Sequence, residues 1–135
     1  MNKNLLVEEV MINIGDFPIV NKNELLRETL EEMNKFGLGI ACIVESNKKL
    51  IGLITDGDLR RLILKVQKPM SAIFVDDALA YSSKKFANVF EKTTIKDALI
   101  KMEELKIWDL PVLDSDGKLK GLLHLHPALK FVLGI

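Results

Sequence analysis

The side chains best suited to chemistry lie in one run, Thr55 to Arg61. Thr55 and Asp58 are three residues apart, the spacing of a capping box, in which each side chain accepts a hydrogen bond from the other's backbone N–H at the start of a helix. Arg60 and Arg61 follow, and a guanidinium group is suited to pairing with phosphate. Alternatively, both lie on a solvated helix face. Because neighbouring helix positions point about 100° apart, we expect at most one of the two arginines to reach a common ligand.

The two histidines, His124 and His126, are the other chemical candidates. On an extended strand, residues two apart point to the same side, an arrangement that a metal could use. Two histidines without a further ligand do not amount to a metal site, and we predict none. We expect them to line a ligand cleft or to contact phosphate when protonated. The one cysteine, Cys42, lies among apolar residues and is interpreted as a core thiol.

Composition excludes several classes of protein. The chain has 135 residues with 19 basic and 19 acidic side chains, so its formal net charge is zero. This balance argues against a nucleic-acid binder that works by bulk attraction to phosphate. No apolar run approaches the roughly 20 residues that span a bilayer, and the first residues lack the apolar core of a secretory signal. We therefore expect a cytoplasmic protein, with neither nucleic acid nor membrane as a partner.

An internal repeat organises the chain. A shift of 69 residues aligns positions 20–64 with 89–133 without a gap, with nine identities in 45 pairs. Val20 falls on Val89, and Gly52 falls on Gly121. Most other pairs keep apolar against apolar. A repeat of this length indicates two copies of one structural unit.

Each copy predicts the order strand, helix, strand, strand, helix. The first strands are expected near Pro18–Val20 and Ala87–Phe90, and the hairpins over residues 40–54 and 110–123. Apolar residues at helical spacing predict the first helices, with the positions Leu26, Thr29, Leu30, Met33 and Phe36 in one copy and Ile95, Ala98, Leu99, Met102 and Leu105 in the other. A short helix over Val75–Ala80 would match one over Val7–Met11. We divide the chain into repeat one with an N-terminal helix (1–66), a linker (67–86) and repeat two (87–135).

This tandem order, with the strings GLITDGDL (52–59) and LPVLDSDGKLKGLL (110–123), resembles the CBS-domain pair, or Bateman module. TDGDLRR (55–61) with LHLH (123–126) looks closest to the CBS pair at the C-terminus of arabinose-5-phosphate isomerases, and similar strings occur in CBS pairs fused to nucleotidyltransferases. The resemblance implies an α/β (α+β) fold of two tandem β-α-β-β-α repeats packed with pseudo-two-fold symmetry.

The resemblance also implies a ligand site. In nucleotide-binding CBS pairs, residues at the positions of Thr55 and Asp58 hold the phosphate and the ribose, and two charge-assisted hydrogen bonds from a diol to a carboxylate are reasonable chemistry. One repeat supplies this half and the other the base pocket, here Ala87, Asn88 and Ile107–Asp109. Trp108 would stack on the base, plug the repeat interface or contact a second copy.

The second copy departs from the pattern. The repeat places His124 and Pro127 where the first copy has Thr55 and Asp58. Proline cannot accept a hydrogen bond from a diol, so we expect one nucleotide site, not two.

We therefore predict a non-catalytic regulatory module with no required cofactor. It would bind AMP, ADP, ATP or a nucleotide-sugar in the cleft between the repeats. Binding would modulate an attached or partner enzyme, such as a sugar-phosphate isomerase or a nucleotidyltransferase. Homodimers through CBS pairs are expected. The alternative is a ligand-independent dimerisation module. A complete small enzyme is the least favoured, because no catalytic triad and no glycine-rich phosphate loop occur in the sequence.

Overall fold

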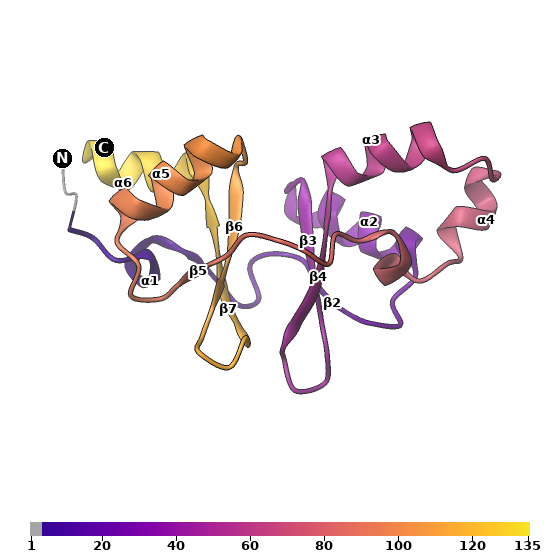
Figure 1. The fold of residues 1–135 in the computed structure, drawn as a ribbon, viewed down its shortest axis with the longest axis horizontal. Coiled ribbons are helices and arrows are strands. Elements are labelled where there is room, and N and C mark those ends of the chain that lie inside the picture. The colour runs from indigo at the N-terminus through magenta and orange to yellow at the C-terminus, as the bar shows by residue number, and fades with distance from the viewer. Residues whose placement is uncertain (1–3) are drawn as a thin grey trace. The chain divides into compact units, whose positions relative to one another are not determined.

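The computed structural model describes residues 4–135 and divides into two compact units. Gly15–Phe86 form the first-repeat unit, and the residues up to Ile14 together with Ala87–Ile135 form the second-repeat unit. Each unit contains the predicted order strand, helix, strand, strand, helix (Figure 1). The predicted α/β fold of two β-α-β-β-α repeats is confirmed.

The first-repeat unit is a three-stranded sheet of order β2-β3-β4, with β2 parallel and β4 antiparallel to β3. Its elements are β2 (Ile19–Asn21), α2 (Leu26–Phe36), β3 (Ile40–Val44), β4 (Leu50–Thr55), α3 (Asp56–Lys65), α4 (Met70–Phe74) and the 3-10 turn η1 (Ala78–Tyr81). The apolar face of α2 buries Leu26 and Met33. Gly37 ends this helix in the left-handed conformation at φ 66°, which glycine adopts without strain.

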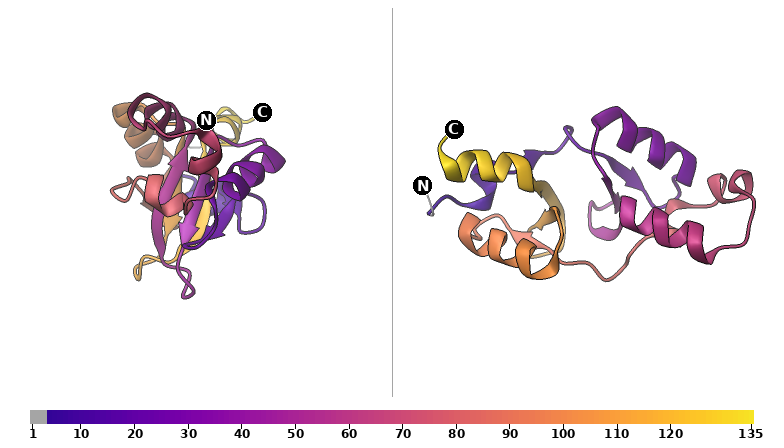
Figure 2. Two further views of the ribbon diagram at one scale, coloured as in Figure 1. Left: turned by 90° about the vertical axis from the view of Figure 1, so that its right-hand side faces the viewer. Right: turned by 90° about the horizontal axis from the view of Figure 1, so that it is seen from above.

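The second-repeat unit has a four-stranded sheet of order β1-β7-β6-β5. Its elements are α1 (Val7–Val10), β1 (Ile12–Asn13), β5 (Val89–Phe90), α5 (Ile95–Leu105), β6 (Asp109–Leu113), β7 (Leu119–His124) and α6 (Leu125–Leu133). Helices α5 and α6 lie side by side, in orange and yellow in the view from above (Figure 2). Each unit has its own cluster of buried apolar residues, including Met33 in one and Met102 in the other.

The segment that precedes each repeat packs in the unit of the other repeat. Strand β1 pairs with β7, with Ile12 opposite Leu122. Helix α1 contacts the same unit through the hydrogen bond that Val7 N donates to Thr93 O (2.8 Å). The linker does the same for the first-repeat unit, where Ser83 forms a bridge with Leu53. The compact units therefore do not follow the predicted division, which kept the N-terminal helix with repeat one. The edge strand of each hairpin explains why these segments pack there, since it offers unpaired backbone N–H and C=O groups to the segment that passes it.

The repeated glycines Gly52 and Gly121 lie where these segments cross. A Cβ at Gly121 would stand 2.9 Å from the backbone oxygen of Ile12 and 2.5 Å from the Met11 sulfur. A Cβ at Gly52 would stand 2.6 Å from the Ser82 hydroxyl. The close crossing explains why both repeats have glycine at this position.

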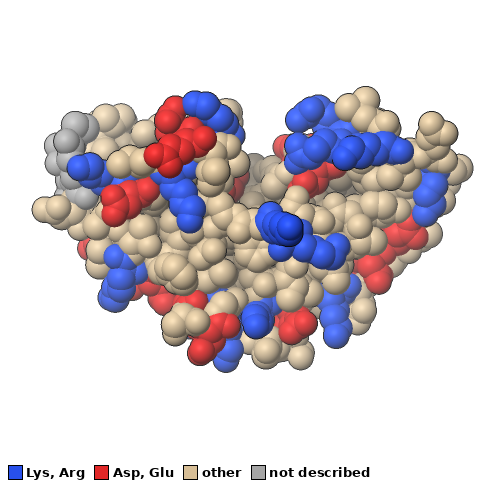
Figure 3. Space-filling view, viewed as in Figure 1, with Lys and Arg blue, Asp and Glu red and all other residues tan. Residues whose placement is uncertain are grey.

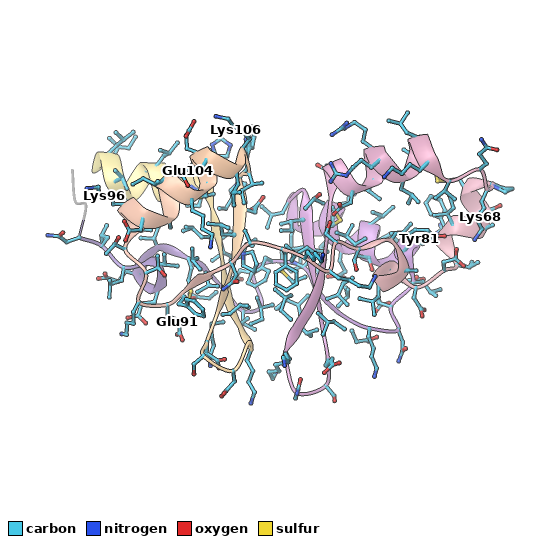
Figure 4. The ribbon with its side chains drawn as sticks, viewed as in Figure 1. Lys68, Tyr81, Glu91, Lys96, Glu104 and Lys106 are labelled. Atoms are coloured by element: carbon cyan, nitrogen blue, oxygen red, sulfur yellow. The ribbon has the colours of Figure 1, made fainter. Side chains whose placement is uncertain are left out.

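A polar cluster joins three residues of the linker to one another. Lys68 donates to Asp76 (2.9 Å), and the Tyr81 hydroxyl donates to the same carboxylate oxygen. Figure 4 labels Lys68 and Tyr81, two members of this cluster. The hydrogen bond from Tyr81, followed by that from Lys68, lowers the pKa of Asp76. The helix predicted over Val75–Ala80 is the shorter turn η1, and α4 precedes it.

Among residues 4–135, no helix is both long enough and apolar enough to cross a membrane.

Candidate functional site

The candidate site lies at the junction of β4 and α3, where the chain turns from strand into helix. Thr55 is the N-cap of α3, and its hydroxyl accepts a hydrogen bond from Asp58 N (3.1 Å). In return, Asp58 Oδ2 accepts hydrogen bonds from Thr55 N (2.9 Å) and from the Thr55 hydroxyl (3.1 Å). The capping box predicted from the spacing is therefore present, and it orients the carboxylate of Asp58.

The other oxygen of Asp58 faces two further donors. Arg61 Nη2 donates to Oδ1 at 2.9 Å, and the Ser83 hydroxyl donates to the same oxygen at 2.9 Å. The Asp58 side chain is 9% exposed, whereas the Arg61 side chain is 51% exposed. A buried anion thus has its charge balanced by a cation that reaches solvent.

Burial and hydrogen bonding act on Asp58 in opposite directions. Burial alone raises the pKa of Asp58, because it disfavours the charged form. Hydrogen bonds from Arg61, Ser83 and Thr55 favour the charged form and leave the pKa below its ordinary value of 3.8. Asp58 is therefore an ionised acceptor at neutral pH, as a carboxylate that binds a diol must be.

The structure distinguishes the two arginines. Arg61 turns back toward Asp58, and its guanidinium lies over Gly57, where a Cβ would stand 3.2 Å from an Arg61 nitrogen. Arg60 is exposed on the same helix. Figure 3 shows a band of basic side chains over α3, the helix that also carries Lys65. Of the two arginines, Arg61 is the one whose contact with Asp58 the structure shows.

Ser83 is the participant that sequence reasoning missed. It lies in the linker, 25 residues from Asp58. Its backbone is held against β4 by two hydrogen bonds with Leu53, Leu53 N to Ser83 O (3.0 Å) and Ser83 N to Leu53 O (2.8 Å). No local spacing signals this contact, because it depends on where the linker crosses the sheet.

The equivalent junction of the second-repeat unit has different chemistry. His124 is the N-cap of α6 but makes no capping hydrogen bond through its side chain. Its Nδ1 lies 2.7 Å from Asp109 Oδ1, and both side chains are mostly buried, at 17% and 15% exposure. The two residues are register partners on β7 and β6. Pro127 lies in the first turn of the helix, as the repeat predicts.

His126 and Trp108 complete this second cluster. The His126 ring lies 5.2 Å from the His124 ring and meets Trp108 edge-on at 5.6 Å. The two histidines do not share a strand, because β7 ends at His124 and His126 already belongs to α6. Trp108 is 61% exposed. Within the described part of the chain, no three side chains of the metal-binding types gather around one point.

The predicted base-pocket residues Ala87, Asn88 and Ile107 lie before β5 and β6, which are parallel. Ala87 and Ile107 both pack on the hydrophobic cluster of the second-repeat unit. Lys101 on α5 donates to the backbone oxygen of Asn88 at 2.6 Å. The structure thus places these residues at one end of two neighbouring strands, and it adds Lys101, which the sequence analysis did not name.

Comparison with known proteins decides the family. A family model described as the CBS domain matches the chain twice, over residues 7–65 and 75–130. The chain belongs to the CBS-domain family. It is a CBS pair, as the sequence resemblance predicted. A crystal structure of CBSX2, a CBS-pair protein of Arabidopsis thaliana, in complex with AMP is similar to this CBS pair with a TM-score of 0.83 at 25% identity, covering 96% of this chain and 97% of that one.

Curated relatives of the CBS pair include arabinose 5-phosphate isomerases. The enzyme KdsD of Francisella tularensis is 29% identical over 133 residues, and KdsD of Pseudomonas aeruginosa is 33% identical over 127 residues. The matches cover 96% and 93% of this chain but 38% and 37% of those enzymes. The chain therefore spans less than two-fifths of the length of these relatives.

Proposed function

We propose that this CBS pair binds a nucleotide and thereby regulates an enzyme on the same or a partner polypeptide. The observation that carries the proposal is the buried, ionised carboxylate of Asp58 beside the half-exposed guanidinium of Arg61. A carboxylate accepts hydrogen bonds from a ribose diol, and a guanidinium pairs with phosphate. CBSX2, at 25% identity, has been crystallised with AMP, which supports an adenine nucleotide as the first ligand to test.

The base-binding half stays part of the proposal. By the family pattern, Ala87, Asn88 and Ile107–Asp109 would hold the base, and Trp108 would stack on it. The Trp108 ring is exposed and therefore offers a face on which a base can stack. A nucleotide-sugar such as a CMP-linked one stays a second candidate ligand, since no base-specific side chain has been identified. We expect no second ribose site, because Pro127 offers no acceptor side chain.

The regulated enzyme is proposed to be a sugar-phosphate isomerase, in view of the KdsD relatives, with a nucleotidyltransferase as the second candidate. Ligand binding would act by preferring one conformation or assembly over another, with a coupling of about 1–3 kcal/mol. The catalytic groups would lie outside this CBS pair.

Calorimetric titration of the purified protein with AMP, ATP and CMP tests the proposal. We expect at least one of them to bind. Asp58→Asn keeps the shape of the side chain but removes its charge, and should weaken binding by at least about fivefold, because hydrogen bonds to a charged group are the stronger ones. Asp56→Asn, an exposed acid in the same helical turn, is the matched control and should bind as the unmodified protein does. Absence of binding for all three nucleotides would remove the proposal.

A ligand-independent assembly module is the second candidate. Helix α6 carries exposed apolar side chains, with Phe131 at 49% and Leu133 at 56% exposure. Such side chains favour association between copies of the chain. Sedimentation with and without nucleotide distinguishes the candidates, because a dimer that is indifferent to every nucleotide favours assembly alone.

A further inference from the structure

The Asp58 carboxylate has its acceptor positions filled by the protein itself. A carboxylate offers about four lone-pair sites. Thr55 takes two of them through its backbone N–H and its hydroxyl, and Arg61 and Ser83 take the other two. A diol can therefore bind Asp58 only by displacing at least one of these donors.

The four donors differ in how freely they can leave. The bond from Thr55 N belongs to the capping box of α3, so losing it would loosen the first turn of the helix, and the Thr55 hydroxyl is held beside Asp58 because it also accepts from Asp58 N. The Ser83 hydroxyl can turn away by a change of rotamer, but Ser83 is only partly exposed and its backbone is held by two hydrogen bonds with Leu53, so the released hydroxyl would have less access to water than a released guanidinium. Arg61 is 51% exposed on the surface of α3 and can leave by a change of rotamer. Arg61 is the donor that a ligand displaces most easily.

Removing Arg61 from Asp58 has an electrostatic consequence. A neutral diol replaces the lost hydrogen bond, but it does not replace the positive charge next to a buried anion. A nucleoside would therefore separate the ion pair without giving the guanidinium a new partner. A nucleotide brings its own phosphate, to which a guanidinium can form two parallel hydrogen bonds.

We propose that Arg61 occupies Asp58 until a nucleotide arrives, exchanges the carboxylate for the ligand's phosphate, and so selects nucleotides over nucleosides. This inference rests on the proposed function. It assigns Arg61 two opposite effects: it opposes binding of the diol, and it favours binding of the phosphate. A residue that only supports the fold would have one effect on both kinds of ligand.

The test compares AMP with adenosine, and CMP with cytidine, by calorimetry on the unmodified protein and on Arg61→Met. Methionine keeps an unbranched helix-forming side chain but has neither charge nor donor. We expect the variant to bind the nucleotide about tenfold more weakly and the nucleoside about three- to tenfold more tightly, in keeping with the loss of one charge-assisted pair. Arg60→Met, the same change at the exposed neighbour, should leave the ratio of the two affinities within about twofold.

The outcomes distinguish a failure of the Arg61 exchange from a failure of the proposed nucleotide binding. If the unmodified protein binds a nucleotide but Arg61→Met weakens nucleotide and nucleoside by the same factor, or changes neither, the exchange by Arg61 is overturned and the proposed function stands. If the unmodified protein binds no nucleotide, both are overturned. Thermal unfolding of each variant, measured alongside, identifies any loss of affinity that comes from unfolding.

Discussion

The two units share one backbone plan but differ at the junction between the last strand and the last helix. In the first-repeat unit this junction holds a buried carboxylate with four hydrogen-bond donors around it. In the second, a histidine and an aspartate pair with each other across β7 and β6, and a proline lies where the carboxylate would be. Each junction contains a carboxylate that is hydrogen-bonded within its own unit, but only the first places that carboxylate next to an exposed cation.

The two repeats keep similar residues at packing positions but different polar residues at the junction between the last strand and the last helix. Positions that meet the hydrophobic cluster or a crossing segment are alike, as with Met33 and Met102 or Gly52 and Gly121. Positions that face the junction differ. A duplicated unit can therefore keep its fold while only one copy keeps a site for a ligand.

The largest expected effect comes from the crossing points. Gly121→Ala would bring a methyl group to 2.9 Å from the backbone oxygen of Ile12, which cannot rotate away. At Gly52 the closest atom is the hydroxyl of Ser82, a side chain that can move. We expect Gly121→Ala to destabilise the protein by about 1–3 kcal/mol and Gly52→Ala by less. Urea unfolding of both variants measures the difference, and an equal or larger cost at Gly52 would show that the distinction between a backbone obstacle and a side-chain obstacle does not decide the cost.

A pH titration of stability sharpens the contrast at the junctions. The pKa of Asp58 in the folded protein lies below its ordinary value of 3.8, because hydrogen bonds from Arg61, Ser83 and Thr55 outweigh the opposing effect of burial. The ionised form therefore stabilises the fold at pH above 3.8, and this contribution is lost as the pH falls through the folded pKa.

The measurement is urea unfolding of the unmodified protein and of Asp58→Asn between neutral pH and pH about 3. The stability difference between the two proteins should shrink toward the acid end. Asp56→Asn controls for the loss of one acid in the first turn of α3. A difference that stays constant or grows on acidification would contradict the assigned role of these hydrogen bonds.

Local patterns made much of this structure predictable. Helices α2 and α5 begin and end where the spacing of apolar residues predicts, and Thr55 and Asp58 form the capping box that their separation indicates. Both kinds of signal depend on residues within a few positions of one another. The internal repeat made the order of strands and helices predictable, since a pattern found in both copies is less ambiguous than the pattern of either copy alone.

Contacts across long sequence distances were not predictable in the same way. Ser83 reaches Asp58 because the linker pairs with β4, and α1 joins the second-repeat unit because β1 pairs with β7. His124 and Asp109 were both candidate residues, but their pairing follows from strand register, which composition does not specify. Only the three-dimensional structure therefore shows which residues surround Asp58 and which surround His124.

The smallest expected effect concerns the first helix of each repeat, α2 and α5. Leu25 and Thr94 are the N-caps of α2 and α5 with nearly the same backbone angles, φ −71° and ψ 151° against φ −71° and ψ 150°. Thr94 accepts a hydrogen bond from Asp97 N (3.2 Å), whereas Leu25 makes no capping bond through its side chain. Thr94→Ala should therefore cost about 1 kcal/mol of unfolding free energy, and Leu25→Thr should gain about 0.5 kcal/mol, less than a full cap because a half-buried leucine is lost. Thr94→Ser is the control, since serine caps as well as threonine.

If Leu25→Thr destabilises the protein, the leucine contributes more through its packing beside the linker than a hydrogen-bonded cap would. The two repeats would then differ in how their first helix is held as well as in the polar residues of their junctions.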